Sequence, residues 1–432
     1  MAQMRPNILY INSHDTGRYV QPYGHAIPTP TIQALAEDGV LFRQAFCAGP
    51  TCSPSRAALL TGCYPHQNGM IGLAHRGFRL NDPRQHLQHT LQRAGYFTAQ
   101  AGFQHVVPWD RVSELGYDAL LGDNKVAHTA AAEFLDSAPR QPFYLEVGIV
   151  ETHRVFPQPD ADIRPEYCMP PAILPDTPDT RQDMARFKTS ARILDSKIRA
   201  VLDALDDNGL AENTLVICTT DHGIAFPHMK CNLTDHGIGV MLIMRGPGVS
   251  GAGRAIDSMV SHIDVYPTIC ELLEIDPPDW LEGVSLVPLL SGKDREIHDE
   301  LFAEVTYHAA YEPMRCVRTK RHKYIRRFGG RETPVMPNCD EGETRDLWLA
   351  NGWNERRVEQ EQLFDLLFDP MECDNLAGDV RFEPVLEDMR RRLDDFMVRT
   401  SDPLLKGPVP PPSGAQLNDP DHMSPNDPVF VV

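Results

Sequence analysis

Histidine and aspartate residues follow four apolar segments that we predict to be buried strands. The segments are residues 8–12, 96–101, 143–150 and 215–220. The polar residues after them are, in chain order, His14 and Asp15, His105, His153, and Asp221 with His222. Ligands of open α/β sheets bind beyond the carboxyl ends of the strands. We therefore expect these side chains to converge on one rim of a sheet.

The aspartates in this set predict a site for one divalent metal ion. Asp15 and the run Asp221-His222-Gly223 supply carboxylate oxygens, which suit Ca²⁺, Mg²⁺ or Mn²⁺. Such a metal acts as a Lewis acid and as a template for a substrate oxygen. The alternative for Asp221 is structural, as the capping residue of a strand-to-helix turn.

The two other histidines, His105 and His153, predict proton transfer. A neutral imidazole near pH 7 can give up or accept a proton. We expect one of them to protonate a leaving group and the other to deprotonate a hydroxyl, and the sequence leaves open which does which. The alternative for each is a structural hydrogen bond.

The strands that carry these residues alternate with helical stretches through the first three-quarters of the chain. This pattern predicts a mostly parallel sheet covered by helices on both faces. One long helix is expected after Thr180, which we predict as its N-cap, and before Gly209. From residue 315 the pattern changes. A hairpin over residues 315–318 and 323–326 and a helix over residues 382–400 indicate a smaller antiparallel unit.

Composition limits the classes of function. The 432 residues are 42% hydrophobic and 23% charged, with a formal net charge of −19 at pH 7. This charge argues against binding to nucleic acid or to an anionic membrane. An enzyme with this charge that cleaves anions has to concentrate positive potential locally. No apolar run could span a bilayer and no export signal precedes the first strand, so we expect a cytoplasmic protein.

A cysteine motif adds a nucleophile to these candidates. It is the run Cys52-Ser53-Pro54-Ser55-Arg56, continued by Ala57-Ala58-Leu59-Leu60-Thr61-Gly62. This run resembles the signature of the type I sulfatases, a branch of the alkaline-phosphatase superfamily. The resemblance implies that a formylglycine-generating enzyme oxidises Cys52 to Cα-formylglycine. One hydroxyl of the hydrated aldehyde would attack sulfur, and collapse to the aldehyde would expel sulfate. The alternative is a buried structural cysteine.

The resemblance also assigns roles to other residues. It implies that Cys52 contributes to the metal site, that Arg56 holds the oxygens of the nucleophile, and that Lys230 contacts the sulfate. His105 and His153 match positions that contact the leaving oxygen and the sulfate. A solvated surface lysine is the alternative for Lys230. The metal would be Ca²⁺ or Mn²⁺, with Asp15, Asp221 and His222 as ligands.

Two departures from the family pattern affect these assignments. The family has Asp-Asp after the first strand, where this sequence has His14-Asp15. This change puts His14 in question as a ligand and shifts the metal preference towards Mn²⁺. The family form Gly-Lys-x-His is here Gly102-Phe103-Gln104-His105, so the site loses one positive contact to the sulfate.

Within the family, the chain looks closest to the sulfamidase and arylsulfatase group. The runs that carry this likeness are residues 52–62, 65–70 and 223–227. The resemblance implies an alkaline-phosphatase-like α/β fold with a catalytic domain at residues 1–312 and a C-terminal subdomain at residues 313–405. A Pro-rich tail follows at residues 406–432, which either docks on a second subunit to form a homo-oligomer or is disordered.

We expect a sulfuric ester hydrolase that acts on a small anionic sulfate ester such as an aryl sulfate. Three alternatives remain open at this point. The first is a phosphonate monoester or phosphate diester hydrolase, and the second is a sulfamidase that cleaves an N–S bond. The third is a binding protein without catalysis, which would require an unmodified Cys52 or an empty metal site.

Overall fold

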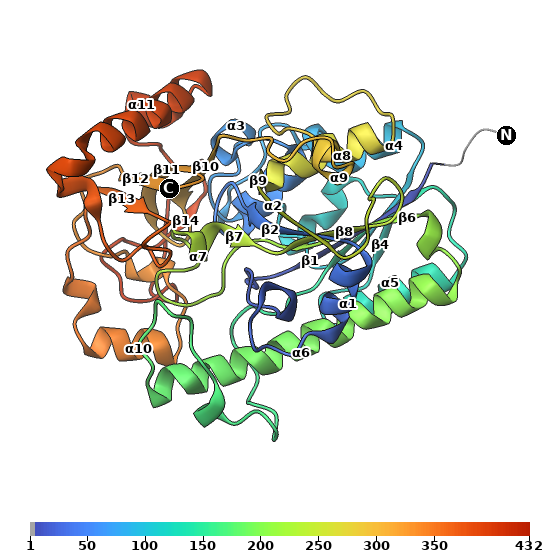
Figure 1. The fold of residues 1–432 in the computed structure, drawn as a ribbon, viewed down its shortest axis with the longest axis horizontal. Coiled ribbons are helices and arrows are strands. Elements are labelled where there is room, and N and C mark those ends of the chain that lie inside the picture. The colour runs from blue at the N-terminus through green and yellow to red at the C-terminus, as the bar shows by residue number, and fades with distance from the viewer. Residues whose placement is uncertain (1–4) are drawn as a thin grey trace.

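A nine-stranded, mostly parallel sheet forms the centre of the computed structural model, which describes residues 5–432 (Figure 1). The strand order is β4-β3-β5-β1-β6-β8-β2-β7, and β9 pairs with β2. Four neighbouring strands run parallel and end at the same rim: β3 Phe97–Gly102, β5 Phe143–Gly148, β1 Asn7–Ser13 and β6 Thr214–Thr220. The others are β2 Val40–Phe46, β4 Ala119–Leu121, β7 Gly239–Val240, β8 Leu242–Arg245 and β9 Arg254–Ser261.

Helices cover both faces of this sheet, as the sequence predicts. One face carries α1 Pro30–Asp38, α5 Ala127–Asp136 and α6 Pro178–Asp207. The other carries α2 Cys52–Thr61, α4 Leu87–Arg93 and α8 Val265–Leu272. Because side chains alternate along a strand, Leu9 of β1 packs in the first layer and Ile8 in the second. The remaining short helices are α3 Pro65–Asn68, α7 Asp235–Ile238, α9 Val287–Leu290 and α10 Glu343–Ala350.

The long helix α6 begins earlier than expected. Its N-cap is Thr177, whose side chain accepts a hydrogen bond from the backbone N–H of Thr180. The predicted cap, Thr180, is the third residue of the helix and completes the capping box. The reason is Pro178, whose fixed φ and missing N–H favour the first helical position. The helix ends at Asp207, just before the predicted stop at Gly209.

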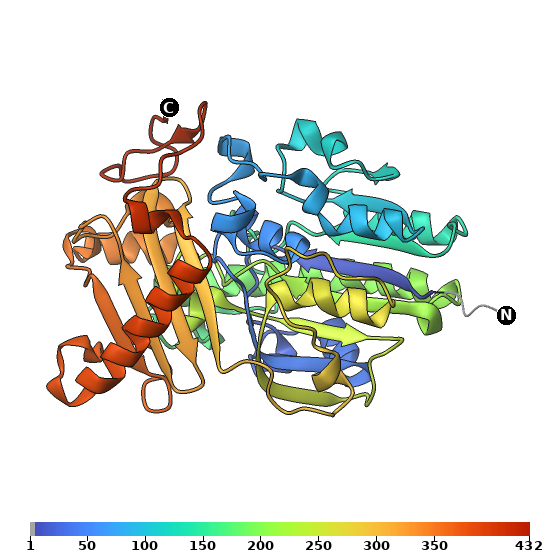
Figure 2. The ribbon, with the colours of Figure 1, turned by 90° about the horizontal axis from the view of Figure 1, so that it is seen from above.

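A four-stranded antiparallel sheet with one long helix forms the C-terminal part (Figure 2). Its strands are β10 Glu300–Tyr307, β11 Tyr311–Thr319, β12 His322–Arg327 and β13 Glu361–Asp365. Helix α11 Glu383–Arg399 packs against it, which confirms the predicted small sheet and helix. The first strand, β10, lies before residue 313, where we placed the start of the subdomain. The division of the chain into three domains stays a prediction.

The C-terminal tail folds back onto its own chain. Its strands β14 Gln416–Leu417 and β15 Phe430–Val431 pair with each other. The guanidinium of Arg76 donates hydrogen bonds to the side chain of Asn418 and to the backbone of residues 416 and 425. The tail is therefore ordered, so the alternative of disorder is wrong. Docking on a second subunit stays a prediction. None of the helices formed by residues 5–432 has the length and the apolar character needed to cross a membrane.

A buried ion cluster within the C-terminal part supports a stability prediction. Arg315 on β11 is fully buried and pairs with Asp402 and, at 3.5 Å, with Glu304. Replacing Arg315 with Met should lower the free energy of unfolding by about 3–5 kcal/mol, because it leaves buried carboxylates without their partner. The matched control is Arg326→Met on β12, whose partner Asp394 is half exposed and whose loss should cost below about 1 kcal/mol. Urea denaturation measures both, and equal losses would contradict the prediction.

Candidate active site

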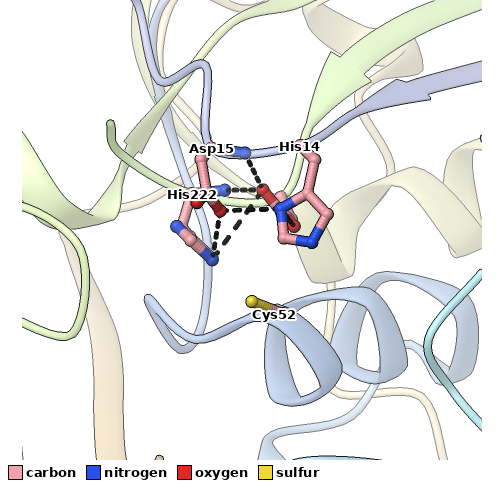
Figure 3. Close-up of side chains that lie close together, drawn as sticks. His14, Asp15, Cys52 and His222 are labelled. Carbon is pink, nitrogen blue, oxygen red and sulfur yellow. Dashed lines mark hydrogen bonds and ion pairs between the residues drawn. The ribbon is translucent and has the colours of Figure 1, made fainter. Parts of the chain in front are cut away.

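The residues predicted at the strand ends converge beside the cysteine motif (Figure 3). Strands β1 and β6 pair in parallel with Ser13 opposite Thr220, so the residues that follow each strand are brought together. Potential ligand atoms lie within 4.8 Å of one another on five buried residues: His14, Asp15, Cys52, Asp221 and His222. The structure thus brings together the five residues named as candidate metal ligands, and their roles stay a prediction.

Helix α2 brings Cys52 to the cluster as its first residue. All ten residues of α2 are buried, which holds the thiol in place at the rim. Burial raises the pKa of the Cys52 thiol well above its ordinary value. An unmodified Cys52 is therefore a protonated thiol near neutral pH. Since the thiolate is the reactive form, the geometry disfavours Cys52 itself as the nucleophile.

The acidic residues of the cluster are held in their ionised form. Burial opposes ionisation of Asp15, but Lys230 and the neighbouring histidines keep the pKa of Asp15 well below its ordinary value. For Asp221, burial has the same effect and is outweighed by His14, His222 and Arg56, which lower its pKa. Two buried carboxylates are thus available to a cation.

The donor set fits a divalent metal ion. Nε2 of His222 is buried, lies 3.3 Å from Oδ1 of Asp15, and has no hydrogen-bond partner among residues 5–432. Nδ1 of His14 lies 2.7 Å from Oδ1 of Asp15 and 3.1 Å from Oδ2 of Asp221. Burial lowers the pKa of His14 to about 4, so its imidazole is neutral and can act as a ligand. The carboxylate oxygens suit both Ca²⁺ and Mn²⁺. The imidazole nitrogens shift the preference towards Mn²⁺.

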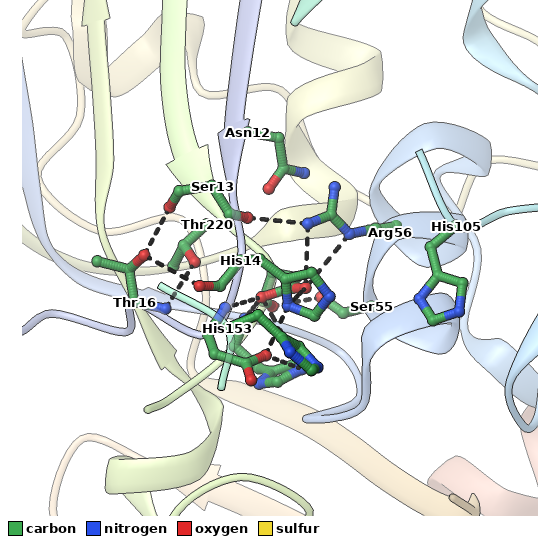
Figure 4. A network of polar contacts seen from close by, with 12 residues as sticks. Asn12, Ser13, His14, Thr16, Ser55, Arg56, His105, His153 and Thr220 are labelled. Atoms are coloured by element: carbon green, nitrogen blue, oxygen red, sulfur yellow. Dashed lines mark hydrogen bonds and ion pairs between the residues drawn. The ribbon is translucent and has the colours of Figure 1, made fainter. Parts of the chain in front are cut away.

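Arg56 lies against this cluster, close to Ser13 and His14 (Figure 4). Its Nη2 donates to the backbone oxygen of Ser13 at 2.9 Å and lies 3.2 Å from Oδ2 of Asp221. The neighbouring Ser55 donates to the backbone oxygen of Asp221. The ring of Phe103, which stands where the family has lysine, lies 4.9 Å from the guanidinium of Arg56. Phe103 therefore packs over an existing positive charge instead of adding one.

The two candidate proton-transfer residues lie at different distances from His14. The ring of His153 is 4.5 Å from that of His14, and its Nδ1 contacts the backbone oxygen of Arg154. The ring of His105 is 6.3 Å from that of His14. Nε2 of His105 lies 2.7 Å from Nδ1 of His75, and the planes of the two rings are nearly parallel. His75 has no motif around it, so the sequence did not identify it.

Lys230 is buried, which rules out the alternative of a solvated surface lysine. Its Nζ lies 2.9 Å from Oδ2 of Asp15 and 2.8 Å from Oδ2 of Asp340. Burial alone would lower the pKa of Lys230, but Asp15 and Asp340 together raise it well above its ordinary value. Lys230 therefore carries a positive charge beside the metal-ligand cluster. Asp340, from an irregular segment of the C-terminal part, is a second residue that the sequence did not identify.

Two family models match this chain. A model described as Sulfatase matches residues 6–275, and one described as N-sulphoglucosamine sulphohydrolase, C-terminal, matches residues 228–336.

Similar proteins include an ulvan-active sulfatase of Formosa agariphila, which is 30% identical over 92% of this chain and 81% of its own. Human N-sulphoglucosamine sulphohydrolase is 29% identical over 94% of this chain and 93% of its own. Among solved structures, the phosphonate monoester hydrolase of Agrobacterium radiobacter superposes with a TM-score of 0.72 at 22% identity, covering 94% of this chain and all of the other. This last likeness concerns the fold.

Proposed function

Because this chain belongs to the sulfatase family, we propose that it hydrolyses small sulfate monoesters with a nucleophile made from Cys52. The family membership makes it a sulfatase, and the finer assignment rests on one observation. Cys52 lies buried among the carboxylate and imidazole ligands of a metal site, with the thiol itself protonated. Oxidation to formylglycine by a generating enzyme would replace that thiol with a hydrated aldehyde, which supplies an attacking hydroxyl and a way to release sulfate.

Asp15, Asp221 and His222 would hold the metal, with His14 as a further ligand and position 52 beside it. Bound there, Ca²⁺ or Mn²⁺ would supply Lewis-acid polarisation of a sulfate oxygen. Arg56 keeps Asp221 oriented through its buried ion pair. Lys230 presents a fixed ammonium to the sulfate, which concentrates positive potential in a chain of net charge −19.

We assign the two proton transfers by distance from His14. The ring of His153 lies 4.5 Å from that of His14, and His153 would take the proton that the diol loses. The ring of His105 lies 6.3 Å from that of His14, beside His75, and His105 would protonate the leaving oxygen. His105 has to carry a proton for this step, whereas burial lowers its pKa well below the ordinary value, so the negative charge of a bound sulfate would have to raise that pKa.

Replacing Arg56 with Ala should lower kcat/KM for an aryl sulfate by about 10²–10³-fold, because a preorganised charge in a dry site is lost. Arg56→Lys keeps the charge but not the two-point contact to Ser13 and Asp221, so it should recover only part of the rate. Metal content, measured in parallel, separates the loss of the metal from the loss of the charge. Near-wild-type turnover in Arg56→Ala would contradict the role assigned to this residue.

The second candidate reaction is hydrolysis of phosphonate monoesters or phosphate diesters. Phe103 in place of lysine favours it, because the site then has one positive contact fewer for a sulfate. A sulfamidase activity is the third candidate, and the 29% identity with N-sulphoglucosamine sulphohydrolase supports it. The cytoplasmic location and the association of subunits through the tail stay predictions.

One experiment separates these reactions. The protein is co-expressed with a formylglycine-generating enzyme, and kcat/KM is measured for an aryl sulfate, an aryl phosphonate monoester and an N-sulfated glucosamine. The proposal predicts the largest value for the aryl sulfate among these three. A larger value for either of the other two would assign the corresponding alternative.

A further inference from the structure

Two polar side chains from the C-terminal part reach the neighbourhood of Lys230. Asp340 precedes helix α10 Glu343–Ala350, and His308 follows strand β10 Glu300–Tyr307. The two segments lie side by side, because the backbone N–H of Ala310 donates a hydrogen bond to the side chain of Asn338 at 2.9 Å. The reaction assigned above uses neither residue. Asp340 is linked to the metal-ligand cluster through Lys230, which also pairs with Asp15.

Asp340 adds a second carboxylate beside the ammonium of Lys230. Its Oδ2 is buried and lies 2.8 Å from Nζ of Lys230, but the geometry of this ion pair is not that of a hydrogen bond. Lys230 also pairs with Asp15, so one ammonium faces two carboxylates. Burial opposes ionisation of Asp340, yet Lys230 lowers its pKa to about 2. Asp340 is therefore a carboxylate with unused acceptor capacity.

This arrangement places a constraint on the substrate. A sulfate oxygen that binds Lys230 comes close to the carboxylate of Asp340, and two negative charges in a buried site repel strongly. A hydrogen-bond donor on the substrate, placed between its sulfate and Asp340, removes the repulsion and uses the free lone pairs. A leaving group without such a donor leaves Asp340 unpaired.

His308 offers a second partner for the same part of the substrate. It is 6% exposed, and its Nδ1 is buried with no hydrogen-bond partner among residues 5–432. Burial lowers the pKa of His308 well below its ordinary value, so the ring is neutral. The next residue, Ala309, accepts a backbone hydrogen bond from Asn418 of the C-terminal tail at 2.9 Å. The tail therefore fixes the loop that carries His308.

We propose that Asp340 and His308 form the leaving-group subsite, and that they select sulfate esters whose alcohol carries a second hydrogen-bond donor close to the ester oxygen. The donor is a hydroxyl or an ammonium, and the carboxylate favours the ammonium. This inference rests on the proposed function, since it concerns the same site. It distinguishes a polyhydroxy or amino alcohol from a plain aryl or alkyl group as the preferred leaving group.

The test uses three small esters with leaving groups of similar size: propyl sulfate, 2-hydroxyethyl sulfate and 2-aminoethyl sulfate. The enzyme is matured with the formylglycine-generating enzyme and supplied with Mn²⁺ or Ca²⁺. We expect kcat/KM to be about tenfold or more higher for each ester with a donor than for propyl sulfate, since a hydrogen bond to a charged group is worth that much. The ratio of kcat/KM values for two esters is compared within each variant. A general loss of activity, such as one caused by moving Lys230, lowers both values and cancels in this ratio.

The variants separate recognition from structure. In Asp340→Asn the preference for the aminoethyl ester over the propyl ester should fall to about twofold or less, and in His308→Ala the preference for the hydroxyethyl ester should fall. Glu341→Gln removes the neighbouring carboxylate, which is exposed and contacts Ser424 of the tail, and should keep both ratios. Binding of the same esters to Cys52→Ala protein, by calorimetry, repeats the comparison without turnover.

The outcomes are distinct. Equal kcat/KM for all three esters in the wild-type enzyme, or unchanged ratios in both Asp340→Asn and His308→Ala, would overturn the subsite and leave the sulfatase assignment intact. No hydrolysis of any of the three esters or of an aryl sulfate by fully matured, metal-loaded protein would overturn the proposed function itself.

Discussion

Replacement of Cys52 by alanine is expected to lower kcat for an aryl sulfate by roughly 10⁵-fold or more, the scale seen when a covalent nucleophile is removed. The expectation follows from the position of Cys52, whose side chain is the one at the cluster that a generating enzyme could convert into a nucleophile. The side chain is small and buried, so the free energy of unfolding should fall only by about 1–2 kcal/mol. Turnover is measured with matured protein at saturating metal.

Cys63→Ala is the matched control for this variant. Cys63 is also buried and its thiol lies near the backbone oxygens of Thr61 and Trp280, outside the ligand cluster. It should keep wild-type kcat at a similar cost in stability. Substantial turnover in Cys52→Ala, or an equal loss in Cys63→Ala, would remove Cys52 from the reaction.

Asp221→Asn is expected to lower kcat/KM by roughly 10³-fold and to reduce bound metal, because a metal ligand contributes several kcal/mol of transition-state stabilisation. The amide has the same shape, so the change removes a charge and little volume. Arg56 and the ring of His14, which pair with Asp221, would face one carboxylate fewer. Metal content by atomic emission and kcat/KM are measured on the same sample.

Asp195→Asn provides the control for the loss of a buried carboxylate. Asp195 is buried on α6, and its oxygens accept hydrogen bonds from the backbone N–H groups of Thr31 and Ile32 in α1. Its replacement should reduce stability but leave the metal content unchanged. Unchanged metal content in Asp221→Asn would place the metal elsewhere.

The cluster could be predicted from the sequence because each of its aspartates directly follows a strand that the sequence pattern reveals. Asp15 and Asp221 each lie within two residues of the end of a strand, and parallel strands bring their ends to the same rim. The helix that starts at Cys52 then needs only to approach that rim. Residue type and position relative to a strand were therefore enough to identify these side chains.

The outer part of the site could not be predicted in this way. Asp340 meets Lys230 across more than one hundred residues of chain, and it lies in a segment without periodic pattern or motif. His75 is likewise identified only by its contact with His105. For the tail, the sequence left both docking and disorder possible, because its composition cannot build a core alone. Its order in the structure comes from contacts with the rest of the chain, such as that of Arg76 with Asn418.

The sequence did not indicate that strand β10 joins the small sheet, for a related reason. Strand β10 is mixed in its burial pattern at the start, and its place in the second sheet follows from pairing with β11. A single strand carries little information about which sheet it joins. The partner, not the strand itself, determines where the second sheet begins.

The most direct test of the account is the relation between modification of Cys52 and turnover. Samples are prepared with graded amounts of the formylglycine-generating enzyme, and the fraction of formylglycine at position 52 is measured by mass spectrometry of the peptide that contains it. We expect kcat for the aryl sulfate to rise in proportion to this fraction and to extrapolate to zero for the unmodified thiol. Full turnover in protein that retains the thiol at position 52 would contradict it.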